Sequence, residues 1–142
     1  MHTKKYLVTG GTGFIGSTLV KSLIKEGYNV RVLDNDTRGA AERLKSVKDK
    51  IELVNVDIRD AEAVQKACNG MDSVIHLAYI NGTEYFYKMP EIVLEVGVKG
   101  IMNVIDGCIK ENVKELILAS SSEVYQTPPK IPTDEAAPLS IP

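Results

Sequence analysis

A glycine-rich segment near the N-terminus, residues 10–16, has the residue types and spacing of a phosphate-binding loop. Gly10 allows the chain to turn sharply off an apolar run, Gly13 leaves room for a phosphate to approach the backbone, and Gly16 allows the next helix to pack closely. The free N–H groups of the first helical turn and the helix dipole attract anions. The segment therefore predicts a loop that binds the diphosphate of a dinucleotide; the alternative is a tight turn without a ligand.

An aspartate, Asp34, ends the second apolar run at roughly the 20-residue distance that a dinucleotide site requires. Its carboxylate can accept hydrogen bonds from ribose hydroxyls, and its charge would repel a 2′-phosphate, which favours NAD over NADP. Arg38 is close enough in sequence to accommodate such a phosphate. An NADP-linked reductase of a non-sugar carbonyl therefore stays open, as does an Asp34 that only caps its own loop.

Short apolar runs rich in Val, Ile and Leu alternate with helical patterns along the chain. Runs this apolar predict strands that are buried on both faces, as in a parallel sheet. We expect a doubly wound, Rossmann-like α/β fold with three layers, strand order 3-2-1-4-5 and a ligand crevice between strands one and four. The five predicted strands are 6–8, 30–33, 51–56, 73–77 and 116–118.

Three shorter segments between these runs have helical patterns. In the first, the apolar residues expected on one inward face are Phe14, Ile15, Leu19, Leu23 and Ile24. A weaker pattern covers residues 40–47. A third helix follows Asp57, with Asp60 as its N-cap, and its inward residues are Ala63, Val64 and Ala67.

The longest predicted helix covers residues 91–109 and carries two adjacent apolar stripes. The first contains Val93, Val96, Gly97, Gly100, Val104 and Cys108; the second contains Leu94, Val98, Ile101, Ile105 and Ile109, with Met102 beside it. One stripe is enough to cover a sheet, so the second predicts a surface for another helix, from a partner subunit or from chain outside these residues. The alternative is one wide buried face.

The chain has 142 residues, 44% of them hydrophobic, and a formal net charge of -2, which fits one globular domain. This balance favours neither nucleic acid nor an anionic membrane as a partner, and no apolar run is long enough to cross a bilayer. Cys68 and Cys108 lack metal-ligand spacing, so we expect reduced, packed thiols, a cytoplasmic location and no metal. Residues 126–142 are rich in proline and are expected to be a loop or tail, not a helix or central strand.

Six motifs, taken together, resemble the extended short-chain dehydrogenase/reductase family, which includes nucleotide-sugar epimerases, dehydratases and decarboxylases. The family's T-G-x-x-G-x-x-G corresponds to residues 9–16. The other matching segments are Leu33-Asp34-Asn35, Asp57-Ile58-Arg59-Asp60, His76-Leu77-Ala78, Ser120-Ser121-Ser122-Glu123-Val124-Tyr125, and the P-x-x-E-x-x-P loop from Pro132 to Pro138. The resemblance covers essentially the whole chain.

The resemblance implies NAD as the cofactor, a nucleotide sugar as the substrate, and a homodimer formed through the 91–109 helix. The residues that it assigns to the cofactor are Gly10, Gly13, Phe14, Ile15, Gly16, Asp34, Asn35, Asp57, Ile58, Leu77, Ala78 and Ser120. Ser121 is expected to orient the sugar hydroxyl, and Glu123 to transfer protons in later steps. The alternatives are a serine bonded to the backbone and a glutamate in solvent. His76 is given no acid–base role.

The sequence departs from the family pattern at three positions and lacks one motif. Tyr79 and Gly97 stand where alanine and asparagine are usual, and Gln126 replaces a glycine. No tyrosine has a lysine four residues later, so the family's catalytic Tyr-x-x-x-Lys dyad is absent. We therefore expect residues 1–125 to be an NAD-binding domain, residues 126–142 to lead toward a missing catalytic part, and this chain alone to be inactive. A non-catalytic dinucleotide-binding module is the alternative.

Overall fold

Five parallel strands form the centre of the protein, in the order β3-β2-β1-β4-β5. The computed structural model describes residues 3–139. The strands are β1 (Lys5–Thr9), β2 (Asn29–Asp34), β3 (Ile51–Asn55), β4 (Ser73–His76) and β5 (Glu115–Leu118). Thr9 lies opposite both Leu33 and His76, so the carboxyl ends of the central strands meet at one edge of the sheet. The predicted doubly wound sheet and its strand order are confirmed.

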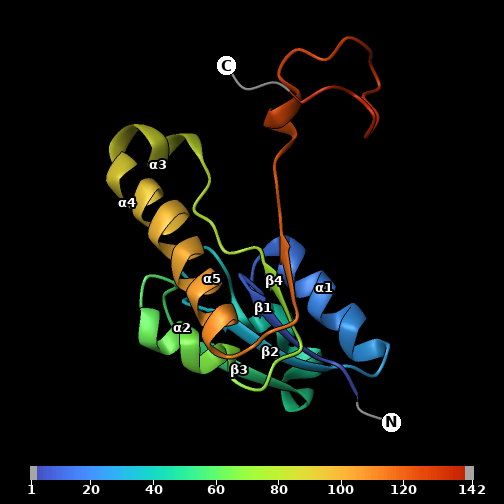
Figure 1. Ribbon diagram of the computed structural model, residues 1–142, viewed down its shortest axis with the longest axis vertical. Helices are drawn as coiled ribbons and strands as arrows, with labels where there is room; N and C mark the ends of the chain where they lie inside the picture. The colour runs from blue at the N-terminus through green and yellow to red at the C-terminus, as the bar shows by residue number, and fades with distance from the viewer. Residues whose placement is uncertain (1–2, 140–142) are drawn as a thin grey trace.

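Helices cover both faces of this sheet (Figure 1). One face packs against α1 (Phe14–Lys25) and the 3₁₀ helix η1 (Ala41–Lys50), around a core that includes Val8, Val20 and Val32. The other face packs against α2 (Ala61–Cys68) and the long helix that includes α5 (Gly100–Lys110), around Leu7, Val74 and Val104. Neighbouring residues of β1 thus point into opposite cores, which gives the expected three layers.

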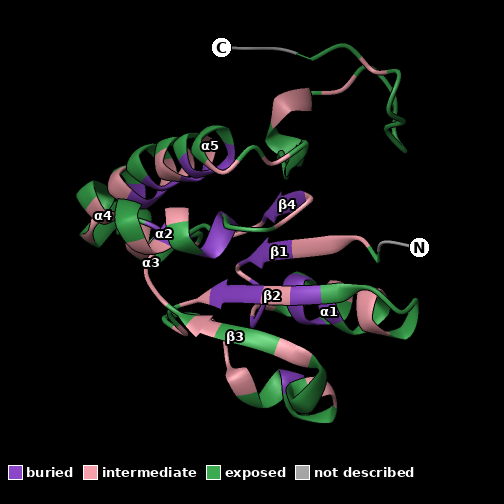
Figure 2. Cartoon of the chain, turned by 60° about the horizontal axis from the view of Figure 1, so that its bottom comes forward, coloured by how far each residue is buried: buried purple, intermediate pink, exposed green. Residues whose placement is uncertain are grey.

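The edge strands differ from the prediction of burial on both faces. All of β4 and the last three residues of β1 are buried, but every residue of β5 is exposed, and each residue of β3 is half-buried or exposed (Figure 2). The reason is their place in the sheet: among the described residues, the helices cover the central strands and leave the outer strands partly open. The apolar residues of β5 are therefore exposed, although their sequence is typical of a buried strand; they are Leu116, Ile117 and Leu118.

The inward face of α1 also differs from the prediction. Phe14 and Ile15 are 84% and 70% exposed, while Gly16 and Val20 are buried. Gly16 packs so closely on the glycine-rich loop that a Cβ there would collide with the Gly10 carbonyl oxygen. This contact sets the rotation of the helix, and it turns residues 14 and 15 outward. Leu19, Leu23 and Ile24 pack against the core as expected.

The remaining short helices lie close to where the sequence placed them. The weak pattern at residues 40–47 forms η1, which buries Leu44. Asp60 caps α2, since its Oδ1 accepts the Ala63 N–H at 3.0 Å, and Val64 and Ala67 are buried as predicted. α3 (Thr83–Lys88) is a further helix, which the sequence pattern does not predict.

The long helix begins with α4 (Pro90–Leu94), continues through a π-helical turn, η2 (Glu95–Lys99), and ends with α5. Most of its first stripe is buried, as Figure 2 shows for the side of α5 that faces the strands. Its second stripe is largely open: Leu94, Val98 and Met102 are 65%, 58% and 51% exposed. The alternative of one wide buried face is therefore wrong.

After β5 the chain leaves the sheet and extends away from it (Figure 1). A short 3₁₀ helix, η3 (Ser122–Tyr125), is followed by turns and bends through residue 139, which agrees with the predicted lack of regular structure. Residues 140–142 of the predicted tail lie outside the described part. Within residues 3–139, no helix has the length and apolar character needed to cross a membrane.

Candidate functional site

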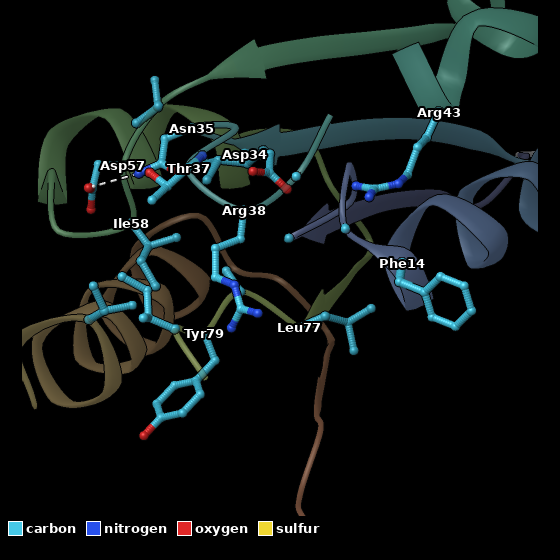
Figure 3. Close-up of a pocket in the computed structure, with 18 residues that line it drawn as sticks. Phe14, Asp34, Asn35, Thr37, Arg38, Arg43, Asp57, Ile58, Leu77 and Tyr79 are labelled. Carbon is cyan, nitrogen blue, oxygen red and sulfur yellow. Dashed lines mark hydrogen bonds between the residues drawn. The ribbon is translucent and has the colours of Figure 1, made fainter. Parts of the chain in front are cut away.

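A pocket of about 350 Å³ lies at the carboxyl edge of the sheet, where the strand order reverses between β1 and β4. This is the position at which open α/β sheets bind ligands. The lining residues are Gly10, Gly13, Phe14, Leu33, Asp34, Asn35, Thr37, Arg38, Gly39, Arg43, Val56, Asp57, Ile58, Leu77, Ala78, Tyr79, Ile80 and Val96. Asn35 and Asp57 lie at one end of the pocket, and Phe14 and Arg43 at the other (Figure 3).

The glycine-rich loop has the geometry of an anion cradle. Gly10 has φ +70°, and a Cβ there would lie 2.7 Å from the backbone nitrogen of Ala78. Gly13 is the N-cap of α1 and supplies no side-chain acceptor to the first turn. The N–H groups of that turn have no partner within the helix, and the positive end of the helix dipole adds to them. The loop therefore fits the diphosphate of a dinucleotide.

Asp34 holds the loop after β2 against the glycine-rich loop. Its Oδ2 accepts the Thr12 N–H at 3.0 Å, and its Oδ1 accepts the Asp36 N–H at 2.9 Å. The Thr12 hydroxyl in turn donates to Asp36 Oδ1 at 2.7 Å. Asp34 thus caps its own loop and also lines the pocket, so the two interpretations of this carboxylate are compatible. Thr12, which the sequence reading did not single out, is fully buried at this junction.

Asp57 is kept ionised at the other end of the pocket. The Arg59 guanidinium donates to both of its oxygens, at 2.8 and 3.0 Å, and Asn35 Nδ2 donates to Oδ2 at 3.0 Å. These contacts, with the Arg59 hydrogen bond as the largest cause, lower the pKa of Asp57. The Arg59 backbone N–H also donates to Oδ1 at 2.9 Å, so each oxygen of Asp57 accepts two hydrogen bonds and the carboxylate keeps its negative charge at this end of the pocket.

His76 lies behind the pocket and has a structural environment. It is buried, and its Nδ1 is 2.7 Å from the Thr9 hydroxyl oxygen. The same oxygen accepts the N–H groups of Leu77 and Ala78, each at 3.2 Å, which leaves the hydroxyl proton for His76. Burial lowers the pKa of His76 to about 4. The imidazole is therefore neutral near pH 7 and fixes the chain that lines the pocket after β4.

The structure brings together most of the predicted cofactor residues but not the predicted catalytic pair. Ile15 and Gly16 do not line the pocket, although both belong to the helical turn beside it. Ser120, Ser121 and Glu123 are exposed in the segment that leaves the sheet, and none of them lines the pocket. Ser121 Oγ accepts the Glu123 N–H at 3.2 Å, a local bond to the backbone.

Several lining residues were not identified from the sequence as site residues. Arg43 belongs to a charged stretch that resembles a solvated helix face, yet its Nη1 donates to the Thr12 carbonyl at 3.0 Å. Only packing in three dimensions reveals this contact. Two departures from the family pattern also meet at the pocket wall: a Cβ on Gly97 would lie 2.8 Å from Cε2 of Tyr79. At the third departure, Gln126 has φ +50°, a conformation that favours glycine.

Comparison with known proteins gives a consistent set of matches. The profile of the NAD dependent epimerase/dehydratase family matches residues 6–141. UDP-glucose 4-epimerase of Neisseria meningitidis serogroup B is 37% identical over 141 residues, and the match covers 95% of this chain and 42% of that protein. A UDP-N-acetyl-alpha-D-glucosaminuronate decarboxylase of Bacillus cytotoxicus is 34% identical, with 89% and 40% covered. The chain thus spans less than half the length of these relatives.

Solved structures agree with this result. The UDP-glucose-4-epimerase of Stenotrophomonas maltophila, with bound NAD, superposes with a TM-score of 0.87 at 25% identity over 98% of this chain and 43% of that one. DesIV, a dTDP-glucose 4,6-dehydratase of Streptomyces venezuelae with NAD bound, has a TM-score of 0.85 at 29% identity, with 96% and 45% covered.

Proposed function

Since this chain belongs to the NAD dependent epimerase/dehydratase family, we propose that it is the NAD-binding portion of an enzyme that acts on a nucleotide sugar. The observation that carries the proposal is the pocket at the sheet edge, which joins a glycine-rich anion cradle to two carboxylates at the ends of β2 and β3. A diphosphate, a ribose and an adenine amino group are the three parts of a dinucleotide that these features suit.

The proposal gives each part of the pocket a task. The N–H groups beside Gly13 bind the diphosphate, and Asp34 with Asn35 binds the adenosine ribose. The charge of Asp57 attracts the adenine amino group, which would share an oxygen with the Arg59 and Asn35 donors, and Ile58 packs beside the adenine. Leu77 and Ala78, held in place by Thr9, line the nicotinamide side. NAD supplies the hydride acceptor for oxidation at a sugar C4; the chain's own residues orient it and exclude water from it.

Catalytic roles for Ser121 and Glu123 belong to the same proposal. The Ser121 hydroxyl can donate and accept at once, which suits it to orient a sugar hydroxyl. Glu123 would move protons in the steps of a dehydration or decarboxylation. Both roles require the segment after β5 to lie against the pocket, and in this structure it extends away from it.

We further propose that residues 1–125 form the cofactor domain, that residues 126–142 lead toward the substrate part, and that these 142 residues alone have no turnover. The sequence contains no Tyr-x-x-x-Lys to take the hydroxyl proton. The exposed stripe of the long helix supports a homodimer through that helix. Two buried free thiols, Cys68 and Cys108, support a cytoplasmic location.

Calorimetric titration of the chain with NAD and with NADP tests the cofactor assignment. We expect binding of NAD in preference to NADP. Asp34→Ala should reduce the affinity for NAD by about tenfold, because ribose hydrogen bonds to a charged acceptor are lost. It should also reduce the preference for NAD over NADP, because the repulsion of a 2′-phosphate disappears. Asp49→Ala, which removes an exposed carboxylate on η1, is the control for net charge.

Three results would each contradict a part of the proposal. A folded chain that binds neither NAD nor NADP at millimolar concentration would leave the pocket without its assigned ligand. Turnover of UDP-sugars by the 142 residues with NAD would contradict the claim that they lack the proton acceptor. An unchanged NAD-to-NADP preference in Asp34→Ala would remove the role given to that carboxylate.

A further inference from the structure

The charged side chains that line the pocket differ in whether they have partners. Asp34, Arg43 and Asp57 are held by the hydrogen bonds described above. The guanidinium of Arg38 has neither a hydrogen bond nor an ion pair with any residue in the described range 3–139. The pocket therefore contains a guanidinium whose donors are available to a ligand.

Arg38 reaches from one wall of the pocket toward the other. It belongs to the loop after β2, and its side chain extends toward Leu77 and Tyr79, which follow β4 (Figure 3). Its Cζ lies 5.9 Å from the ring centroid of Tyr85 in α3, within cation–π range. A Cβ on Gly82 would lie 3.5 Å from Arg38 Nη1. The side chain thus crosses the pocket between the β2 and β4 sides, with an aromatic ring behind it.

We propose that Arg38 binds the bridging phosphates of the dinucleotide, as a cation added to the N–H groups of the glycine-rich loop. This inference rests on the proposed function and adds a residue that neither the glycine motif nor Asp34 supplies. Backbone N–H groups carry only partial charge, whereas a guanidinium carries a full charge and donates two parallel hydrogen bonds to phosphate oxygens. No carboxylate of the described residues forms an ion pair with it.

The 2′-position of the adenosine ribose is the other place where a phosphate could meet Arg38. Asp34 lies in the same pocket and its carboxylate repels a phosphate on that ribose. A bridging phosphate lies farther along the dinucleotide than this ribose, and the Arg38 side chain extends away from Asp34, toward Leu77 and Tyr79 (Figure 3). The geometry therefore favours the diphosphate.

The test compares ligands that contain and lack the diphosphate. Arg38→Met keeps a long apolar side chain and removes the charge. We expect the dissociation constants of NAD and ADP to rise by about tenfold, since a charge-assisted contact at an exposed position is lost, while that of adenosine stays unchanged. Arg38→Lys should give an intermediate value, because it keeps the charge and loses the paired donors. The slope of log affinity against log salt should also decrease in Arg38→Met.

Lys48→Met is the matched control, since Lys48 is an exposed cation on the neighbouring η1 that does not line the pocket. If Arg38→Met binds NAD and ADP with the same dissociation constants as the wild type, the inference is overturned, while NAD binding itself stays in place. A loss confined to NADP would overturn it in favour of the 2′-phosphate, and an equal loss for adenosine would indicate a packing role. A wild-type chain that binds no dinucleotide would instead overturn the proposed function.

Discussion

The Thr9 hydroxyl links β1 to His76 and to the chain after β4 that lines the pocket. It accepts two N–H groups from the chain after β4 and donates its own proton to Nδ1 of the neutral His76. A protonated His76 would carry a proton on Nδ1 and would lose this acceptor. The imidazole therefore stabilises the site only in its neutral form, which burial also favours.

The stability of the protein should for this reason decrease on mild acidification. The pKa of His76 is about 4 in the folded state and 6.5 in its ordinary range, so the unfolded chain takes up the proton first as the pH falls. The stabilisation is complete above pH 6.5 and is lost between that value and pH 4. We expect the free energy of unfolding to fall by about 2 kcal/mol from pH ~7 to pH ~5.

Urea denaturation at a series of pH values measures this dependence. His76→Gln lacks the titrating group and serves as the control, because its curve contains the contributions of all other groups. Between pH ~7 and pH ~5, the free energy of unfolding of the wild type should fall by about 2 kcal/mol more than that of His76→Gln. Parallel curves would show that His76 does not titrate with a lowered pKa.

Residues that belong to a local pattern can be predicted from the sequence, whereas residues that act across the fold cannot. Asp34 was found because it ends a strand at a fixed distance from the glycines. Thr12 and Arg43 were missed, since their partners lie 24 and 31 residues away along the chain. Phe14 was placed in the core because periodicity gives a helix face but not the contact at Gly16 that sets its rotation.

The long helix meets the pocket through one close contact between a large and a small residue. Gly97 lies in the π-helical turn of this helix, and the ring of Tyr79 occupies the space that a side chain at position 97 would need. Val96 and Tyr79 both line the pocket. Tyr79 and Gly97, the two departures from the family pattern that are far apart in the sequence, therefore pack against each other.

Substitutions at these two positions should be coupled. Gly97→Asn alone forces the half-exposed Tyr79 ring to turn toward solvent, and we expect this to reduce stability by about 1 kcal/mol. In a Tyr79→Ala background the space is empty, so the same change should reduce stability by less than about 1 kcal/mol. Urea denaturation of the four proteins of this double-mutant cycle gives the coupling. An equal effect in both backgrounds would contradict the shared packing.

At the element scale, the strands could be predicted because each is a compact apolar run, and their order followed from the strand–helix alternation. The burial of each strand by neighbouring side chains could not be predicted. The apolar residues of β5 require burial, but a pattern does not say whether the same chain provides the covering side chains, and here Ile117 and Leu118 are exposed. α3 was missed because its segment, 83–88, is short and buries no residue fully.

The molecule as a whole presents apolar side chains along the outer side of its long helix. Leu94, Val98, Met102 and Ile109 are all more than half exposed, and they follow one another at helical spacing. The opposite side of the same helix is buried against α2 and the sheet. A stripe of this kind on a monomer is unfavourable in water, and two copies packed along it would bury it symmetrically.

Val98→Glu should therefore break the proposed dimer without unfolding the protomer. The Val98 side chain is exposed in the protomer, so the fold does not depend on it, but a symmetric contact would place two carboxylates in an apolar interface. Burying an unpaired charge is unfavourable by about 3 kcal/mol or more, which corresponds to at least about a hundredfold increase in the dimer dissociation constant. Sedimentation over a range of protein concentrations measures it.

Lys110→Glu introduces the same side chain on the same helix, outside the stripe, and should leave the association unchanged. The circular dichroism spectrum and the urea midpoint of the Val98→Glu monomer should show a folded protomer, like those of Lys110→Glu. A wild-type chain that stays monomeric at all concentrations would remove the dimer proposal for these 142 residues. A Val98→Glu variant that dimerises as tightly as the wild type would contradict a contact along this stripe.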